Sequence, residues 1–482
     1  MSFQEESKYL RSAASLLAYA VSDLYPTAQI VGVEVSEVDF VCDFVFEQKP
    51  SLDLIAERMR AAIKADLSIE PLDMMRENGV EFLRHHGQTL LADRLESFEK
   101  NIVPLVKIEE FTHFSPGKQL ASVGEIGAFS LLGMELGEVT RIRGVAFSGK
   151  GQLKKFLKKV EEARKCDPIR LGRELRLFTF DEGKCLWHPN GFAVREALRQ
   201  FWVREHKKQK FSFVAGESHD AIYQSFERDE SQLPCCMAQS GELDRETIFC
   251  TLDQLLGELI SSLQFIVETV RIFGFQYRLY FIDGNDSGAG WKKSVVKSLE
   301  GFDYEREQSG EGPKVEVRIF DTLGRAWKGP CIEVALAEKL VYKGYDGKDH
   351  QPMVISRSTF GSIERFVTLL TEQFAGRFPF WLAPEQLRVI PVTEKQWVYA
   401  EAIGKRLADS GYRVTVDTRG KRLNAKVHEA QVQRIPKLII VGEREEDKGS
   451  VALREGAVTR DVTIDDLLQG LQQEDEENLF KR

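Results

Sequence analysis

The sequence has few cysteines, and they show no regular spacing. Seven cysteines in 482 residues are an odd number, which argues against a disulfide framework and favours a reducing cytosol. Cys235 and Cys236 form the one cluster in the sequence, and adjacent residues have the wrong spacing for a metal knuckle. We therefore expect these two thiols to pack as small apolar groups.

Long apolar runs and an excess of positive charge are also missing. No run approaches the roughly 18 apolar residues of a membrane helix, and the first residues (MSFQEESKYL) are polar and acidic. We expect no signal peptide, no membrane partner and a cytoplasmic protein. The net charge of −9 argues against a protein that binds nucleic acid over its whole surface.

One window is basic in spite of this overall charge. Residues 404–437 carry nine Lys or Arg and three Asp or Glu, a local charge of +6. Such a window is either a solvated face or a surface that grips an anionic partner such as RNA.

Helical and strand periodicities divide the chain into four segments. The predicted segments are 1–145, 146–176, 177–382 and 383–482. In the first, the alternating run over 30–46 predicts a strand pair, and flanking helical periods such as 52–65 indicate an α+β domain. The second segment is predicted to be a strongly charged helix that connects two domains.

The third and fourth segments differ in the order of their elements. In 177–382, predicted strands are scattered between non-adjacent helices, which suits an antiparallel sheet. In 383–482, short apolar strands and helices alternate closely and predict a small α/β sheet. The final helix, at 464–472, is expected to end in a disordered acidic tail.

The stretch from Gly361 to Pro384 carries the most specific pattern. Apolar residues at helical spacing predict a helix of about four turns, and Gly376 follows as its stop signal. Glu364 and Arg365 lie beside the apolar stripe. An arginine there either lies at the rim of a core or binds an anion such as a triphosphate.

The string G-x-x-E-R-F in this stretch resembles motif 3 of class II aminoacyl-tRNA synthetases, whose arginine packs on ATP. The continuation LLTEQFAGRFPFWLAPEQLRVIPVTE resembles the junction between the catalytic and anticodon-binding domains of threonyl-tRNA synthetases. The resemblance extends over nearly the whole chain. It implies a multidomain α+β and α/β fold, in which a class II antiparallel sheet domain precedes a C-terminal α/β anticodon-binding domain.

The first segment resembles the editing domain of this family, which hydrolyses mischarged tRNA with an H-x-x-x-H pair and a later C-x-x-x-H. Arg11 and Ser15 stand at the positions of the first pair, and the later element falls on His113 to Gly117 (HFSPG). A lone His113 on a loop is expected to be a surface residue. Without a second residue to position water, hydrolysis has no evident base, so we expect that editing is lost.

Threonyl enzymes hold a catalytic zinc ion with one cysteine and two histidines, and the resemblance places Thr247 and Ser356 at the histidine positions. The segment with the cysteine is missing after Lys210, together with the motif 1 proline. Zinc engages the threonine hydroxyl, which an apolar pocket cannot distinguish well from a methyl group. Because catalytic zinc needs three protein ligands, we predict that this protein holds no zinc.

Features of an ATP site are partly kept. Motif 2 of the family is an R-x-E on an antiparallel strand, and Arg228-Asp229-Glu230 is the matching string. In the loop that follows, Glu242 lies near the place of the family's second arginine and adenine-stacking aromatic residue. ATP with Mg²⁺ is therefore the candidate cofactor.

Gly312-Pro313-Lys314 matches the G-P-K of the family, with Glu311 in place of a tyrosine. Lys314 either reaches a phosphate or is a surface lysine at the start of a strand. Lys328 and Glu333 stand where the family has two glutamines. The predicted ATP-binding remnants are Arg228, Glu230, Lys314 and Arg365.

The last segment resembles the anticodon-binding domain almost without gaps. The basic window then lies where the family grips the anticodon loop, and Arg454 matches an arginine used near the anticodon bases. Gly420 stands in place of an asparagine. The predicted RNA-binding residues are Arg419, Lys421, Arg422, Lys426, Arg434 and Arg454.

Three functions stay open on these patterns. The first is a threonyl-tRNA synthetase-like protein that has lost zinc-dependent activation and editing but keeps tRNA, other RNA or protein binding. The second is an ATP-dependent ligase that forms an adenylate of another substrate. The third is an active threonine–tRNA ligase of unusual form. The expected partners are tRNA or another RNA, a full-length synthetase, or a second copy of the chain.

Overall fold

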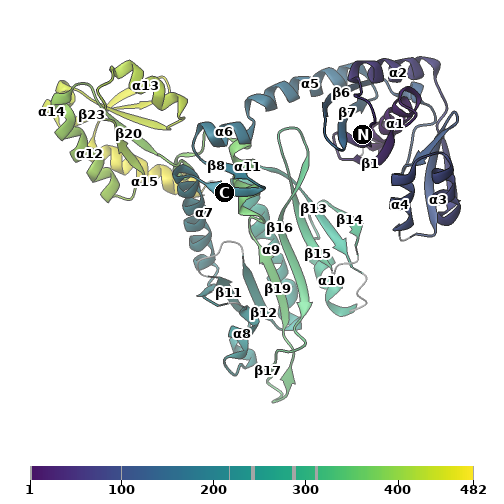
Figure 1. Cartoon of the computed structure of the whole chain (residues 1–482). Helices are drawn as coiled ribbons and strands as arrows, with labels where there is room; N and C mark the ends of the chain where they lie inside the picture. The colour runs from purple at the N-terminus through teal and green to yellow at the C-terminus, as the bar shows by residue number, and fades with distance from the viewer. Residues whose placement is uncertain are drawn as a thin grey trace. The chain divides into compact units, whose positions relative to one another are not determined.

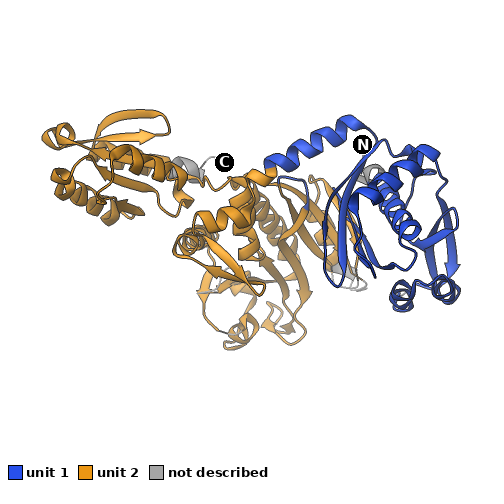
Figure 2. Cartoon of the chain, turned by 45° about the horizontal axis from the view of Figure 1, so that its top comes forward, with its two compact units in different colours: residues 1–162, 322–325 blue, residues 163–321, 326–482 orange. Residues whose placement is uncertain are grey.

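The computed structural model describes residues 3–98, 100–216, 218–239, 245–284, 289–309 and 313–480 (Figure 1). Two units are distinguished, one of residues 1–162 with 322–325 and one of residues 163–321 with 326–482 (Figure 2). Within the described residues, no helix is long and apolar enough to cross a bilayer. The domain boundaries predicted at residues 145, 176 and 382 stay predictions.

The first unit holds a four-stranded antiparallel sheet of order β1-β2-β7-β6 and a three-stranded antiparallel sheet of order β3-β4-β5. The strands are β1 (Gln29–Val35), β2 (Phe40–Val45), β3 (Glu70–Met75), β4 (Ile102–Ile108), β5 (Phe111–Phe114), β6 (Ala128–Glu135) and β7 (Thr140–Phe147). The helices are α1 (Phe3–Leu24), α2 (Leu52–Ala65), α3 (Arg76–His85) and α4 (Thr89–Glu96), and α5 (Lys150–Lys165) begins in this unit and ends in the second.

Helix α1 packs on the larger sheet through a stripe of small and aliphatic residues. Ala13, Leu16, Leu17 and Ala20 are fully buried. The alanines let the helix backbone lie close to β2, where the Cys42 thiol is 3.8 Å from the carbonyl oxygen of Ala14. The strand pair predicted over 30–46 is confirmed by β1 and β2, and the helix predicted over 52–65 is confirmed by α2.

Two predictions for the first half of the chain are wrong. His113 lies in strand β5 and its exposed fraction is 0%, so it is not a surface residue on a loop. The charged segment up to residue 176 is not one helix, because α5 ends at Lys165 and α6 (Pro168–Glu174) begins two residues beyond the break. Asp167 caps α6 and Pro168 occupies its first turn, so the α5 helix cannot continue.

The second unit is built on a large sheet of order β10-β11-β12-β19-β16-β15-β13-β14 (Figure 1). Its pairs are antiparallel except β10–β11 and β13–β14, so the predicted antiparallel sheet is confirmed. The strands are β10 (Ser212–Val214), β11 (Cys235–Gln239), β12 (Glu246–Cys250), β13 (Gln276–Asp283), β14 (Tyr304–Gln308), β15 (Lys314–Phe320), β16 (Ala326–Leu336) and β19 (Met353–Ser358). Two short hairpins accompany it, β8 (Phe178–Asp181) with β9 (Lys184–Trp187) and β17 (Tyr342–Lys343) with β18 (Asp349–His350).

One face of this sheet is covered by helices. Alternating residues such as Ile248, Ile355 and Val315 point to that face and join the core with Leu259 of the long helix. The helices of this region are α7 (Pro189–Lys208), α8 (His219–Gln224), α9 (Leu252–Ile272), α10 (Ala289–Ser298) and α11 (Ile363–Gln373). The predicted apolar stripe of α11 is confirmed: Phe366, Val367 and Leu370 are buried, and Gly376 follows with a φ of +72°.

The C-terminal part of the second unit is the predicted α/β sheet, of order β21-β20-β22-β23-β24. Helix α13 packs on one face, around Val427 and Leu438, whereas α12 and α15 pack on the other. The prediction of a tail after residue 472 is wrong, because α15 continues as a helix to Phe480. The elements are α12 (Trp397–Asp409), α13 (Leu423–Val432), α14 (Glu443–Lys448), α15 (Ile464–Phe480), β20 (Leu387–Pro391), β21 (Val414–Val416), β22 (Lys437–Val441), β23 (Ser450–Glu455) and β24 (Val458–Thr463).

Candidate functional site

Four residues that the resemblance aligned with substrate and phosphate contacts lie in one row across the large sheet. Thr247 is directly opposite Ser356, Ser356 is opposite Glu333, and Glu333 is opposite Lys314. Directly opposed residues of antiparallel strands point to the same face. The next row, with Ile248 and the residues opposite it, points into the helix-covered core. The four residues therefore share the other face, which is called the open face below.

The donor set at the Thr247 end of this row does not fit a zinc ion. Thr247 and Ser356 offer hydroxyl groups, whereas protein zinc sites are built from imidazole, thiolate and carboxylate groups. His219 is the one imidazole there, and its Nδ1 lies 2.7 Å from the Thr247 hydroxyl. Among the described residues, no group of three or more His, Cys, Asp or Glu could hold a metal. The predicted absence of zinc stays a prediction.

His219 was missed by sequence reasoning, although it lies beside Thr247. Ser218 caps helix α8 and sets His219 as its first residue, where it is 5% exposed. Burial and the nearby Arg245 lower its pKa below the ordinary histidine value. A polar residue that begins a six-residue helix gives no periodic signal, so no pattern in the sequence indicated its burial.

The string Arg228-Asp229-Glu230 is not on an antiparallel strand, so the strand expected there is wrong, and its assignment to motif 2 stays a prediction. Asp229 caps a single 3-10 turn (Glu230–Gln232) and forms only an isolated parallel bridge with Lys343 of β17, and β11 begins after the turn. The Arg228 guanidinium lies 4.8 Å from the ring centre of Tyr223, and Glu230 accepts a hydrogen bond from the backbone of Tyr345. Both residues hold local structure around α8 and the β17–β18 hairpin.

The cations of the open face are held mainly by carboxylates of the same face. Arg318, which the sequence did not point to, binds Glu307 through two hydrogen bonds of 2.8 and 2.6 Å, and Glu316 through a third of 2.8 Å. Its guanidinium also lies 3.8 Å from the Tyr280 ring centre. Burial opposes the charge, but these carboxylates outweigh it and raise the pKa of Arg318.

Lys314 and Arg365 lie at separate places of this face. Lys314 is half-buried at the start of β15, about 14 Å from Thr247 if each of three strand spacings is about 4.8 Å. Arg365 is exposed, with its Nη1 3.4 Å from the carbonyl oxygen of Lys328 and its guanidinium 5.8 Å from the Trp327 ring centre. Glu242, Glu311 and Gly312 lie outside the described residues.

A buried ion pair fixes the two strands that carry Thr247 and Ser356. Glu246 and Arg357 precede and follow these residues, are opposite each other, and are 1% and 3% exposed. Burial alone would raise the pKa of Glu246, but Arg357 and His206 outweigh it and lower that pKa to about 2. The Nε1 of Trp202 also donates to Glu246 over 2.7 Å.

The positions aligned with editing residues meet in the first unit. Arg11 donates to the carbonyl oxygen of Pro116, and its guanidinium occupies the space where a side chain on Gly117 would stand. The Ser15 and Ser115 hydroxyls are 3.4 Å apart. His113 lies in the same short stretch, and neither of its ring nitrogens has a hydrogen-bond partner. Burial lowers the pKa of His113 to about 4.

The two adjacent cysteines of β11 pack as predicted. Cys235 packs against the cluster around Tyr223 and Phe249, and Cys236 packs against the main core. Successive strand residues point to opposite faces, so the two thiols cannot ligate one ion together. Burial raises the pKa of both thiols, that of Cys236 to about 12.

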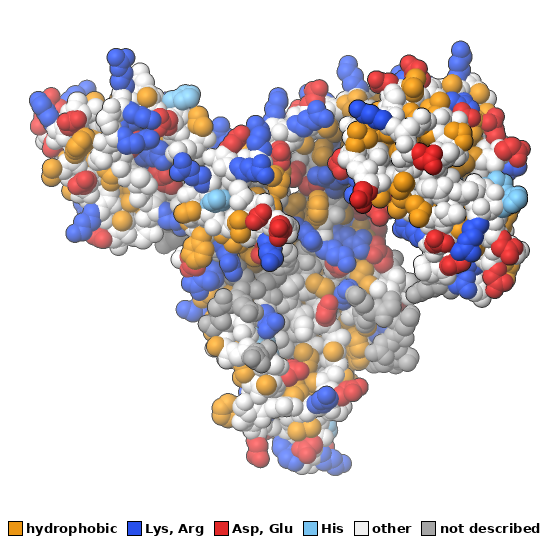
Figure 3. Space-filling model, in the orientation of Figure 1, with side chains coloured by type: hydrophobic (Ala, Val, Ile, Leu, Met, Phe, Trp, Pro, Cys, Tyr) orange, Lys and Arg blue, Asp and Glu red, His pale blue; other side chains and the backbone are white. Residues whose placement is uncertain are grey.

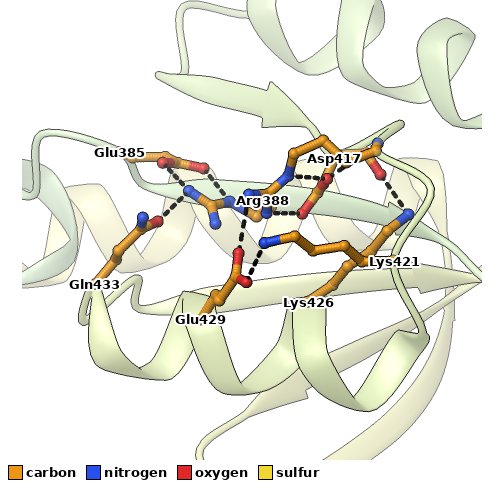
Figure 4. Close-up of polar contacts among 8 residues, drawn as sticks. Glu385, Arg388, Asp417, Lys421, Lys426, Glu429 and Gln433 are labelled. Carbon is orange, nitrogen blue, oxygen red and sulfur yellow. Dashed lines mark hydrogen bonds and ion pairs between the residues drawn. The ribbon is translucent and has the colours of Figure 1, made fainter.

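The predicted RNA-binding face on the C-terminal domain is partly closed by its own carboxylates (Figure 4). Arg419 binds Asp417 through two hydrogen bonds of 2.8 and 2.6 Å, and its Nη1 lies 2.8 Å from Glu429. Lys421 pairs with the same Glu429. The Arg419 hydrogen bonds lower the pKa of Asp417. In Figure 3, scattered acidic side chains lie among the more numerous basic ones on the visible face of this domain.

The prediction that one face carries the five cations of the basic window, from Arg419 to Arg434, is wrong for two of them. Lys426 is 3% exposed, and its Nζ donates to the carbonyl oxygen of Asp417 over 2.8 Å. Arg434 follows the end of α13 and lines a separate cavity with Gly376. Arg454 lies on β23 and donates to the carbonyl oxygen of Gly456. Arg422 is exposed and, among the described residues, has no ion-pair partner.

Replacing Lys426 by methionine is expected to lower the free energy of unfolding by about 1–3 kcal/mol, because a buried carbonyl oxygen loses its partner. Affinity for RNA should not change, since the ammonium group is out of contact with solvent. Urea unfolding and filter binding measure the two effects. Lys421→Met removes an exposed pair and serves as control, with an expected stability loss below about 1 kcal/mol. Weaker RNA binding by Lys426→Met at unchanged stability would contradict this assignment.

Comparisons with known proteins agree with this architecture. An anticodon binding domain model matches residues 386–474. The threonine–tRNA ligase of Syntrophotalea carbinolica is 30% identical over 561 aligned positions, which cover 97% of this chain and 88% of that protein. The threonine–tRNA ligase of Oleidesulfovibrio alaskensis is also 30% identical, with 97% and 87% covered. The RNA binding domain of Cryptosporidium parvum threonyl-tRNA synthetase shares the fold at a TM-score of 0.60 and 22% identity, covering 64% of this chain and 98% of that one.

The antiparallel sheet with its α11 helix and the anticodon binding domain together define a class II aminoacyl-tRNA synthetase-like protein. Two relatives narrow this class, because each is 30% identical to this chain over an alignment that covers 97% of it. The chain belongs to the threonine–tRNA ligase family. The family resemblance predicted from the motifs is thereby confirmed.

Proposed function

We propose that this protein binds tRNA through its C-terminal domain and has lost zinc-dependent threonine activation and editing. The single observation that carries the loss of activation is the cross-strand pair of Thr247 and Ser356 on the open face. Two hydroxyl groups can hydrogen-bond a substrate, but they do not bind zinc as two imidazoles do.

Without zinc, the site is expected to discriminate poorly between threonine and valine. Threonine and valine have nearly the same shape, and an apolar pocket separates such a pair by only about 100-fold. A metal that engages the hydroxyl group removes this ambiguity. Without it, the open face has no strong means of selecting threonine, and His219 is already bonded to Thr247.

The loss of editing is supported by the cluster in the first unit. Arg11 fills the space over Gly117, and Ser15 faces Ser115 rather than an imidazole. His113 has no solvent contact and a pKa lowered to about 4, so it cannot relay a proton to a water molecule at the surface.

RNA binding is supported by the anticodon binding domain match and by the exposed cations at the start of α13. Arg422 is the strongest candidate, because its guanidinium is exposed without an ion pair among the described residues. Arg419 and Lys421 would have to exchange Glu429 and Asp417 for phosphate groups. We therefore expect moderate affinity that falls steeply with salt.

The RNA proposal is tested by filter binding of total tRNA between about 50 and 200 mM salt. Arg422→Met is expected to weaken binding several-fold at low salt and to reduce the slope of log affinity against log salt by about one. Arg406→Met is the matched control, because Arg406 is an exposed arginine on α12, on the opposite face of the sheet. Equal effects of the two variants, or a salt-independent affinity, would overturn the proposal.

A second candidate function is an ATP-dependent ligase with another substrate. The observation that favours it is Arg365, an exposed guanidinium near Lys328 and Trp327 with no carboxylate partner among the described residues. An arginine in this state keeps its hydrogen-bond donors for a phosphate. Pyrophosphate exchange with each of the twenty amino acids tests it. A signal that depends on one amino acid and is lost in Arg365→Met would favour the ligase.

The remaining expectations also stay proposals. All seven cysteines are free thiols, which suits a reducing cytoplasm. Association with a second copy or with a full-length synthetase is proposed from the family alone, and sedimentation of the purified chain with and without such a synthetase tests it.

A further inference from the structure

A cavity of about 290 Å³ lies within the second unit, away from the open face and from the start of α13. It is bounded by the ends of α6, α11 and α13, the start of α7 and the start of β20. Its lining includes three arginines, one histidine and one asparagine, which are Arg176, Arg388, Arg434, His188 and Asn190.

Arg434 is the most unusual group of this cavity. Its Nη1 is buried and has no hydrogen-bond partner. Burial and the nearby Arg377 lower its pKa, so its charge is poorly compensated. Gly376 makes room for it, because a Cβ there would lie 2.6 Å from that Nη1. A buried guanidinium nitrogen without a partner costs stability unless a ligand satisfies it.

The carboxylates of the cavity are already used. Glu385 holds Arg388 through two hydrogen bonds of 2.8 and 2.7 Å, and Gln433 holds it from the other side (Figure 4). Glu174 lies 3.5 Å from Arg170. Arg176 has no ion-pair partner among the described residues. Glu174 also lies near Arg434 and partly compensates its charge, so the three arginines and two carboxylates of the lining leave a net positive charge.

The backbone around the cavity contributes partial charges of both signs, because three helices end there and one begins there. The carbonyl groups at the ends of α6, α11 and α13 accept hydrogen bonds from the residues that follow, Leu177, Gly376 and Ile435. The 20-residue helix α7 begins at the cavity with no side-chain cap at His188. Its first-turn amide groups therefore add positive partial charge to that of the arginines.

We propose that this cavity binds a phosphate-class anion of about the size of pyrophosphate. Arg434 supplies its unpartnered Nη1, and Arg176 closes the site from the end of α6. Arginine is the side chain best suited to oxygens of this kind, because its planar fork donates two parallel hydrogen bonds. The bound anion would tie the end of α13 to α6 and α7.

Calorimetric titration of the full chain with sodium pyrophosphate, at an ionic strength fixed with sodium chloride, tests this site. Saturable 1:1 binding is expected, and Arg434→Met should weaken it by at least about tenfold, the effect of one charge-assisted hydrogen bond. Arg406→Met is the matched control, since it removes one exposed arginine on α12 that does not line the cavity, and it should bind as the unchanged chain does.

A second variant separates binding from folding. Arg176 has a φ of +54°, a conformation that glycine adopts without strain. Arg176→Gly should therefore leave the melting temperature unchanged or higher while weakening pyrophosphate several-fold. Unchanged binding in both Arg434→Met and Arg176→Gly would overturn the proposal. Weaker pyrophosphate binding by Arg365→Met, together with unchanged binding by Arg434→Met, would also overturn the proposal, because the anion would then bind the open face.

Discussion

Replacing Arg357 by methionine is expected to lower the free energy of unfolding by about 3–5 kcal/mol, a large share of the stability of an ordinary domain. The cause is not the loss of an attraction alone. Glu246 would stay buried beside His206 without its main cationic partner, and burial strongly disfavours an unpaired carboxylate. Urea unfolding followed by tryptophan fluorescence and circular dichroism measures the change.

Two controls make this prediction specific. Arg278→Met removes an ion pair with Glu305 in which both side chains are about 40% exposed, and should cost less than about 1 kcal/mol. The double variant Glu246→Gln with Arg357→Met should recover part of the loss, because a neutral amide still accepts the Trp202 hydrogen bond. A double variant less stable than Arg357→Met would contradict the charge argument.

The first unit is expected to become less stable as the pH falls from about 6.5 to about 4. Replacing His113 by leucine should remove most of this pH dependence. Burial lowers the pKa of His113 to about 4, below the value of about 6.5 in the unfolded chain. Between these values the unfolded state binds a proton that the folded state does not. Stability therefore falls as the pH falls through this window, by about 3 kcal/mol in all.

The measurement is the midpoint of urea unfolding at a series of pH values. At pH 7 the leucine variant should be as stable as the unchanged chain or more stable, because two buried ring nitrogens without partners are removed. His86→Leu, at an exposed histidine, is the control and should keep the pH dependence. A leucine variant with the same pH dependence would show that His113 is not buried in its neutral form.

The regular elements could be predicted because their signals are local. Helix α2 has the predicted bounds, with Ser51 at its start and a left-handed Asp66 at its end. The apolar stripe of α11 and the strand pair of β1 and β2 also follow from periodicity alone. Each of these patterns lies within one short stretch of the chain.

The state of single polar residues could not be predicted in the same way. Lys426 lies in a basic window, yet its ammonium group is buried because the Asp417 carbonyl oxygen, nine residues away, accepts its hydrogen bond. His113 is buried because its strand pairs with β4, and no local pattern indicates that pairing. His219 meets Thr247 only through packing of α8 on the open face.

The candidate site could be predicted only in part, because the pairing register of the strands determines which of its residues lie opposite each other. The resemblance placed Thr247 and Ser356 at two ligand positions of one zinc site, and the pairing of β12 with β19 brings them opposite each other. The string around Arg228 matched motif 2 by residue type alone, and the 3-10 turn that follows Asp229 keeps it out of the large antiparallel sheet. A short motif thus predicts a site only where the backbone around it has the required form.

Threonine charging is the measurement that tests the account most directly. Purified chain, ATP, Mg²⁺, threonine and total tRNA are incubated with and without added zinc, and the same sample is assayed for tRNA binding and for metal content. The account predicts that tRNA is bound in a salt-dependent way while no threonyl-tRNA accumulates and zinc stays well below one ion per chain. Formation of threonyl-tRNA by a sample holding one zinc ion per chain would contradict it.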